Sequence, residues 1–361
     1  VPPPRTPPMK RFITSLAAVT LAAASLWSPT PTAAVAAAVP AVAAPAADSA
    51  STFVVATYNV RCANCSKKPA NSRERLWEVR APVIVAAVKA NDVDLLGVQE
   101  ASSGVLYPGG PSQFENLLSR LGEPFALANG ARYNCVRDWT PSRCSYRNQG
   151  ASQDSRILYK TTKFTLLDDG SLALDARSVG NGSARYLAWA RFTELATGKQ
   201  FYFATAHLEP GMSKGKIATR RAQTYAAIAE LNRVNTDNLP IIWGSDLASS
   251  KLSHSGNTAY DIFLAAGYTD PLGNYYKART ANGRTYAANI VNGQYFTLNN
   301  FAPAPKQYAK YKLGAHLDYV LLKPQMRVEQ WKQVLNLAAD GSFAGVIPSD
   351  HNLVVVTLAL P

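Results

Sequence analysis

The sequence has no glycine at every third position and no heptad pattern, which excludes collagen and coiled coils. It also has no internal repeat and no mid-chain linker, so the length of 361 residues favours one large domain over two smaller ones. Only 17% of the residues are charged and 47% are hydrophobic, an ordinary fraction for a folded protein that excludes wholesale disorder. Past residue 50, no apolar run is long enough to span a bilayer.

Acidic residues are scarce relative to basic ones. The chain has 24 Asp and Glu residues against 37 Lys and Arg residues, which gives a formal net charge of +13. The first 50 residues hold only three basic groups and one acid, so the basic excess belongs to the rest of the chain. This balance favours a polyanionic partner, either nucleic acid or an acidic lipid surface, although the same charge also serves to keep a surface soluble.

The N-terminal residues have the layout of a secretory signal peptide. A charged region begins at Met9, the expected start of translation, and an uncharged apolar run over 12–26 follows, with prolines and Ala-x-Ala sites behind it. We therefore expect residues 1–36 to be an upstream extension plus signal peptide and 37–50 to be an Ala/Pro-rich linker. Residues 51–361 are then the folded domain of a secreted, extracellular protein.

Cysteines are few. The four, Cys62, Cys65, Cys135 and Cys144, form an even set, which in an exported protein predicts disulfides. They can pair in several ways, and we favour local pairing of Cys62 with Cys65 and of Cys135 with Cys144. A redox pair or half of a zinc site at Cys62-x-x-Cys65 has no support, because the chain has no second CxxC and no histidine at zinc-finger spacing.

The hydrophobic pattern beyond residue 50 alternates between strands and helices. We expect strands at 53–60, 93–98, 157–159, 186–192, 201–206, 239–243, 317–322 and 353–360. We expect helices at 72–89, 111–121, 216–234 and 258–266, the first with an apolar stripe of Leu76, Val79, Val83, Ile84 and Val88. The segment 271–314 is rich in Gly, Asn, Tyr and Lys, which predicts a loop-like functional insertion.

Polar residues stand at the ends of several predicted strands. They are Asn59, Gln99-Glu100, His207, Asp246 and Asp350-His351, while Asp318 lies inside an apolar strand, where a carboxylate needs a partner. Carboxylates, an amide and two imidazoles gathered at one edge of a sheet suit a divalent-metal phosphoesterase. Such an enzyme needs oxygen ligands for Mg²⁺, a base that deprotonates water, and donors that hold the developing charge.

These residues carry a family resemblance. The motifs, in chain order, are Thr57-Tyr58-Asn59-Val60, Trp77-x-x-Arg80, Asp94-Leu95-Leu96-Gly97-Val98-Gln99-Glu100, Thr205-Ala206-His207-Leu208, Ser245-Asp246-Leu247, Leu317-Asp318-Tyr319-Val320 and Ser349-Asp350-His351. Together they resemble the endonuclease/exonuclease/phosphatase superfamily, with its DNase I-like fold, over nearly all of 53–361. The resemblance implies a four-layer α/β sandwich, in which two mainly antiparallel sheets are flanked by helices.

The resemblance also implies a metal site and a set of catalytic residues. Glu100 would be the main metal ligand, with Asn59 beside it and Asp350 completing the acid cluster. The expected cofactor is Mg²⁺, with Ca²⁺ or Mn²⁺ left open.

The catalytic residues implied by the resemblance are two histidines and two acids. His351 would act on the scissile phosphate as a general base or as a phosphate-binding imidazolium, and Asp318 would orient it. Asp246 would position or activate the attacking water. His207 would hold the phosphate or protonate the leaving oxygen. Arg185 is a weaker candidate for a phosphate clamp.

The sequence departs from the family pattern at one position. The family usually reads Gly-Asp-x-Asn where this chain reads Ser245-Asp246-Leu247-Ala248, so a donor to the phosphate is missing at Ala248. We expect reduced activity, unless Ser249 or a side chain from another loop substitutes for the asparagine.

The sequence therefore predicts a secreted, metal-dependent phosphodiesterase, in the first place a nonspecific nuclease that cleaves DNA or RNA. A phospholipid phosphodiesterase of the sphingomyelinase C type is the alternative enzyme, although no compact Trp/Phe tip that would enter a bilayer is visible. A catalytically weakened binding protein that retains the fold is the third hypothesis. We expect a monomer.

Overall fold

The computed structural model describes residues 51–130, 154–174, 185–252, 258–273, 287–308 and 314–361. The predicted signal peptide and linker, and the predicted pair Cys135–Cys144, lie outside these residues. No helix within the described ranges combines the length and the apolarity that crossing a membrane requires.

Two sheets form the centre of the fold. The first contains, in spatial order, β3 (Phe125–Leu127), β4 (Arg156–Lys160), β2 (Leu95–Gln99), β1 (Phe53–Asn59), β12 (Val354–Ala359), β11 (Arg327–Gln333) and β9 (Ala287–Val291). The second contains β10 (Asp318–Lys323), β8 (Ile241–Asp246), β7 (Gln200–Ala206), β6 (Arg185–Glu194) and β5 (Phe164–Leu174). Only the β1–β2, β9–β11 and β7–β8 pairs are parallel among the described strands, so both sheets are mixed but mainly antiparallel.

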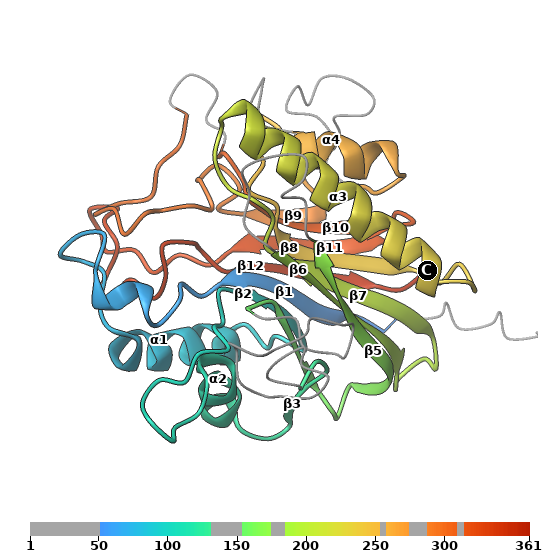
Figure 1. The fold of residues 1–361 in the computed structure, drawn as a ribbon, viewed down its shortest axis with the longest axis horizontal. Helices are drawn as coiled ribbons and strands as arrows, with labels where there is room; N and C mark the ends of the chain where they lie inside the picture. The colour runs from blue at the N-terminus through green and yellow to red at the C-terminus, as the bar shows by residue number, and fades with distance from the viewer. Residues whose placement is uncertain (1–50, 131–153, 175–184, 253–257, 274–286, 309–313) are drawn as a thin grey trace, which may run out of the picture. The chain divides into compact units, whose positions relative to one another are not determined.

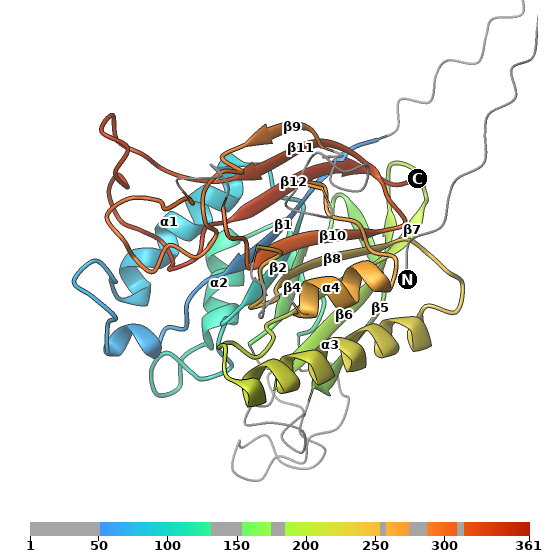
Figure 2. The same ribbon diagram turned by 90° about the horizontal axis from the view of Figure 1, so that it is seen from above.

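Helices cover the outer faces of the two sheets. Helices α1 (Trp77–Ala90) and α2 (Gln113–Leu121) lie on the side of β1 and β2, and α3 (Lys214–Val234) and α4 (Thr258–Ala265) lie on the side of β6 to β8 (Figure 1). Seen at right angles, α3 and α4 lie next to each other on the side of β8 (Figure 2). The predicted four-layer sandwich is confirmed.

The period-two alternation of the strands explains why this chain builds three separate cores. In β1, Val55 packs between the sheets while Ala56 and Tyr58 pack against α1 and α2. In β7, Phe203 packs between the sheets while Tyr202 packs under α3 and α4. Strands β1 and β7 are therefore apolar on both faces, as buried strands of a layered fold require.

The structure corrects two predictions about secondary structure. The predicted stripe of the first helix is wrong in part, because Leu76 and Val79 are 51% and 43% exposed, and Trp77 and Ala81 take the buried face instead. The apolar face is rotated by about one residue from the predicted one. The predicted loop-like segment 271–314 contains strand β9, which pairs with β11 at the edge of the first sheet.

Candidate active site

Side chains that face the space between the sheets change from apolar to polar toward one end of five strands. These rows are Phe53, Val55, Thr57 and Asn59 on β1; Leu95, Gly97 and Gln99 on β2; Phe201, Phe203 and Thr205 on β7, with His207 just beyond it; Ile242, Gly244 and Asp246 on β8; and, against the chain direction, Leu322, Val320 and Asp318 on β10. Gln99 marks the boundary, since its Nε2 donates to Thr205 Oγ1 of the other sheet at 2.8 Å. A Cβ atom at Gly97 would lie 2.6 Å from Gly244 O, so glycine lets the sheets approach each other here.

Glu100 lies directly after β2, at a positive φ of 58° that few residues other than glycine adopt. Its Oε1 accepts from Asn59 Nδ2 at 3.1 Å, and its Oε2 accepts from the Cys62 amide at 3.0 Å. Burial raises the pKa of Glu100, but the neighbouring His207 and the two hydrogen bonds outweigh burial and hold the pKa below its ordinary value. Glu100 is therefore held as a carboxylate.

Asp350 is the second acid on this side of the site. Its Oδ1 accepts from Ser349 Oγ at 3.2 Å, and its Oδ2 lies 3.7 Å from Arg61 Nη1. Burial raises the pKa of Asp350, and the carboxylate of Glu100 adds to the rise. A cation bound by both carboxylates would remove this repulsion, and an oxygen donor set of this kind suits Mg²⁺, Ca²⁺ or Mn²⁺.

Asn59 is a hydrogen-bond donor as it stands in the structure. Besides Glu100, its Nδ2 donates to Asp246 Oδ2 at 3.1 Å, while its Oδ1 accepts from the Arg61 amide at 3.1 Å. Metal ligation by Asn59 would use that Oδ1 atom. The residue therefore links the acids of the first sheet to the acid of the second.

His351 and Asp318 form a hydrogen-bonded dyad. His351 Nδ1 lies 2.9 Å from Asp318 Oδ2, and both side chains are buried. Burial lowers the pKa of His351, but Asp318 and Asp246 outweigh burial and raise the pKa to about 10. The dyad therefore holds its proton on the imidazole.

Asp246 lies at the centre of the site. Its Oδ2 is 3.5 Å from His207 Nε2 and 3.7 Å from His351 Nε2, and its Oδ1 accepts from the Ala248 amide at 2.9 Å. Burial raises the pKa of Asp246, but the two histidines and the hydrogen bonds outweigh burial and lower it. Asp246, Asp318 and His351 place donor atoms within 4.8 Å of one another, yet His351 and Asp318 already satisfy each other, so this group is a dyad beside an acid.

Arg185 contacts His207 in this structure. Its Nη1 lies 3.1 Å from His207 Nδ1, and its Nε lies 3.9 Å from Glu209 Oε2. Glu209 is buried and also forms an ion pair with Lys216 at the start of α3. The sequence analysis missed Glu209, although it lies only two residues after the His207 motif.

Ala248 adopts a positive φ of 48°. Left-handed backbone is unfavourable for alanine and far better tolerated by asparagine, the residue that the family usually has here. Ser249, the expected substitute donor, is 1% exposed. The backbone at Ala248 therefore keeps the conformation that suits an asparagine, although the side chain is absent.

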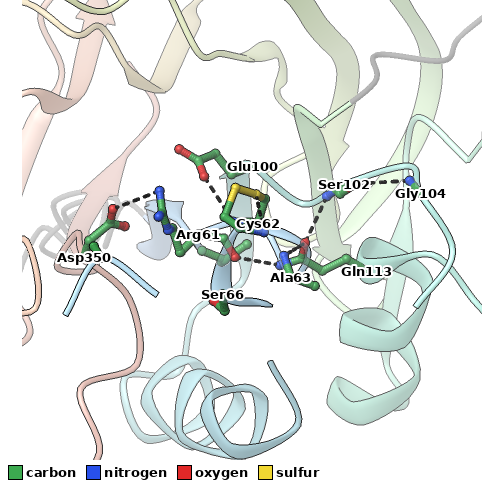
Figure 3. Close-up of a disulfide and its surroundings, with 12 residues drawn as sticks. Arg61, Cys62, Ala63, Ser66, Glu100, Ser102, Gly104, Gln113 and Asp350 are labelled. Carbon is green, nitrogen blue, oxygen red and sulfur yellow. Dashed lines mark hydrogen bonds and ion pairs between the residues drawn. A yellow bond between two sulfur atoms is a disulfide. The ribbon is translucent and has the colours of Figure 1, made fainter. Parts of the chain in front are cut away.

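The loop between β1 and α1, residues 61–75, carries the Cys62–Cys65 disulfide, as the favoured pairing predicted. Figure 3 shows this disulfide beside Glu100, with Arg61 reaching toward Asp350. The sequence analysis missed Arg61, whose side chain also pairs with Glu74 at 3.0 Å. Its position two residues after Asn59 in the sequence could have identified Arg61 as a site residue.

The structure thus joins every described candidate residue in one network of contacts. The members are Asn59, Glu100, Arg185, His207, Asp246, Asp318, Asp350 and His351. The link to Asp350 runs through Ser349, whose Oγ also donates to the Asn59 carbonyl at 2.6 Å.

Comparison with known proteins yields structural neighbours alone. No family model and no curated protein matches the chain. An endonuclease/exonuclease/phosphatase family protein from Bacteroides thetaiotaomicron is 21% identical, with a TM-score of 0.61 over 86% of this chain and 99% of that chain. A mannosyl-6-phosphatase from the same organism is 21% identical, with a TM-score of 0.59 over 85% of this chain and 100% of that chain.

A third neighbour comes from a vertebrate. D. rerio TDP2, complexed with a single strand DNA product, is 15% identical, with a TM-score of 0.52 over 85% of this chain and 99% of that chain. Structural similarity at such low sequence identity shows a shared fold alone. These matches span nearly the whole length of each neighbour. The chain therefore has the DNase I-like fold of the endonuclease/exonuclease/phosphatase superfamily.

Proposed function

We propose that the chain is a divalent-metal-dependent phosphoesterase, and more narrowly a phosphodiesterase that hydrolyses DNA or RNA without sequence preference. The observation that carries the proposal is the convergence of carboxylates, an amide and two imidazoles in one buried network between the sheets. Neighbours named as a phosphatase and as a complex with a DNA product support phosphate-ester chemistry at this site.

The contacts support the following proposed roles. Glu100, Asp350 and Asn59 would hold the cation, which would supply Lewis-acid stabilisation of phosphoryl oxygens. Asp246 positions the attacking water, since its Oδ2 faces the site between both histidines. The His351–Asp318 dyad holds the proton that is exchanged during hydrolysis.

The 61–75 loop favours nucleic acid over lipid as the substrate. Its exposed charged residues are all basic, namely Lys67, Lys68, Arg73 and Arg75, while its one acid, Glu74, is buried against Arg61. The loop contains no large apolar residue that would enter a bilayer. A cationic loop beside the metal-side acids suits the phosphate backbone of a nucleic acid strand.

Neutralising this loop should weaken nucleic-acid binding. In a variant with glutamine at all four exposed cations, we expect KM for a single-stranded oligonucleotide to rise and its dependence on log salt to flatten by about 0.7 for each lost phosphate contact. Four exposed cations away from the loop serve as the matched control: Lys89 in the last turn of α1, and Lys163, Lys199 and Arg327 at the starts of β5, β7 and β11. Equal effects in both variants would show that net charge alone is responsible.

We also propose that the protein is exported, with residues 51–361 as its folded domain. The Cys62–Cys65 disulfide supports export, since such bonds persist in oxidising compartments. Sequencing the N-terminus of protein recovered outside the producing cells tests both points, and recovery of uncleaved protein in the cytosol alone would contradict them.

An assay with five substrates tests the proposed function. Purified protein is offered plasmid DNA, RNA, sphingomyelin, a chromogenic phosphodiester and a chromogenic phosphomonoester, each with Mg²⁺ and with chelator. We expect chelator-sensitive cleavage of nucleic acid and of the chromogenic diester. Preference for sphingomyelin or for the monoester would replace the nuclease assignment, and no turnover of any substrate would favour the binding-protein hypothesis.

Metal binding should stabilise the fold. A ligand that binds only the native state stabilises it by mass action, so Mg²⁺ at a hundredfold excess over Kd should raise Tm by roughly 5 °C. Glu100→Gln keeps the side-chain shape but removes the charge, and should abolish most of this response. Glu78→Gln, at an exposed position on α1, is the control. A full Mg²⁺ response in the Glu100 variant would reject Glu100 as a ligand.

A further inference from the structure

The two histidines of the site have partners of opposite charge at the same ring nitrogen, Nδ1. Nδ1 of His351 faces the carboxylate of Asp318 at 2.9 Å, whereas Nδ1 of His207 faces the guanidinium of Arg185 at 3.1 Å. Nε2 of both rings faces the same oxygen of Asp246, at 3.7 Å and 3.5 Å respectively. The rings therefore present the same edge to the reaction centre but are held from behind by groups of opposite charge.

The chemistry of each partner fixes where the ring proton lies. A guanidinium donates hydrogen bonds and never accepts them, so His207 Nδ1 must offer a lone pair and the proton must sit on Nε2. An ionised carboxylate only accepts, so the proton of His351 in that bond sits on Nδ1. A doubly protonated His207 would direct an N–H at the N–H of Arg185 and place two positive charges side by side.

Arg185 is held in this position by the strand and loop around it. It begins β6, which pairs with β7 in a register that sets Leu187 opposite Ala206, next to His207. Its side chain is 15% exposed, and the Glu209 carboxylate lies 3.9 Å from its Nε. The backbone of Glu209 is itself fixed, because its carbonyl accepts from Arg220 Nη1 at 2.7 Å.

We propose that Arg185 is a positioning residue that fixes the proton of His207 on Nε2, so that His207 donates a hydrogen bond to a phosphoryl oxygen. The inference rests on the proposed phosphodiesterase function. It decides between the two roles that the sequence left open for His207. A neutral imidazole that gave its remaining proton to a leaving oxygen would become an imidazolate, so His207 holds the phosphate, and proton transfer falls to the His351–Asp318 dyad.

The tautomer can be measured directly. Long-range ¹H–¹⁵N spectra of ¹⁵N-histidine-labelled protein with Mg²⁺ at pH 7.5 distinguish the two nitrogens of each ring, and His207→Gln assigns the His207 signals. We expect a single neutral form of His207 with the proton on Nε2. A proton on Nδ1, or on both nitrogens, overturns the proposal whether or not the protein is active.

Variants of Arg185 separate positioning from substrate contact. Arg185→Lys keeps a cationic donor and should keep the tautomer, Arg185→Met should give a mixture of forms, and Arg185→Glu should move a proton to Nδ1. On a chromogenic phosphodiester, kcat should fall about tenfold in the methionine variant and about 10²-fold in the glutamate variant, with KM nearly unchanged. A raised KM with an unchanged tautomer would mark Arg185 as a phosphate clamp and overturn the proposal. If the wild type cleaves no phosphodiester, the proposed function fails, while the spectra still decide the tautomer.

Discussion

Replacing His351 by alanine should lower kcat by about 10²–10⁴, the range typical of a lost general acid or base. Asp318→Asn should cause a loss of similar size, because Asp318 Oδ2 at 2.9 Å orients the imidazole and fixes its proton on Nδ1. The double variant should be little worse than His351→Ala alone, since residues that act as a unit give non-additive losses. Steady-state hydrolysis of one chromogenic phosphodiester at saturating Mg²⁺ measures all three.

Stability controls make this result interpretable. Asp318 and His351 are buried, so each variant must first show a cooperative melt and the wild-type Mg²⁺ response, which reports an intact metal site. Losses that multiply in the double variant would mean that the two residues act independently. In that case Asp318 would contribute through its charge near Asp246 rather than through the imidazole.

The location of the site was predictable because of strand periodicity. In β1, β7 and β8 the residues that face the other sheet become polar at the last position or just beyond, at Asn59, His207 and Asp246. Polar side chains at the buried ends of otherwise apolar strands are unfavourable unless they have partners. Their presence at several strand ends therefore indicated one shared site. Asp318 was predictable for the same reason, since a buried carboxylate requires a partner.

The partners behind the site were not predictable from the sequence. Arg185 comes from β6, and its contact with His207 depends on the register between β6 and β7, which the hydrophobic pattern does not specify. Arg61 reaches Asp350 only because the disulfide loop follows β1 closely. The predicted buried face of α1 was wrong in part because Val79 is apolar but exposed, and apolar residues on a surface are common.

Ala248→Asn should both stabilise the protein and raise its activity. At a φ of 48°, alanine adopts left-handed backbone at a cost of roughly 1 kcal/mol that asparagine largely avoids, so Tm should rise. The new amide would stand two residues after Asp246, where the family places a donor to the phosphate. Because one preorganised donor is typically worth about 10²–10³ in rate, a gain of at least about tenfold in kcat is expected, with a smaller change in KM.

Ala248→Gly is the matched control for that variant. Glycine accepts the positive φ but has no side-chain donor, so it should leave kcat unchanged whatever its effect on Tm. A gain in kcat from glycine as well would trace the effect to relief of backbone strain rather than to a hydrogen bond. Ser249→Ala completes the set: if Ser249 already fills the missing role, this change would abolish activity and Ala248→Asn would add nothing. Robust wild-type turnover that is indifferent to all three substitutions would contradict the interpretation of Ala248 as the site of a lost donor.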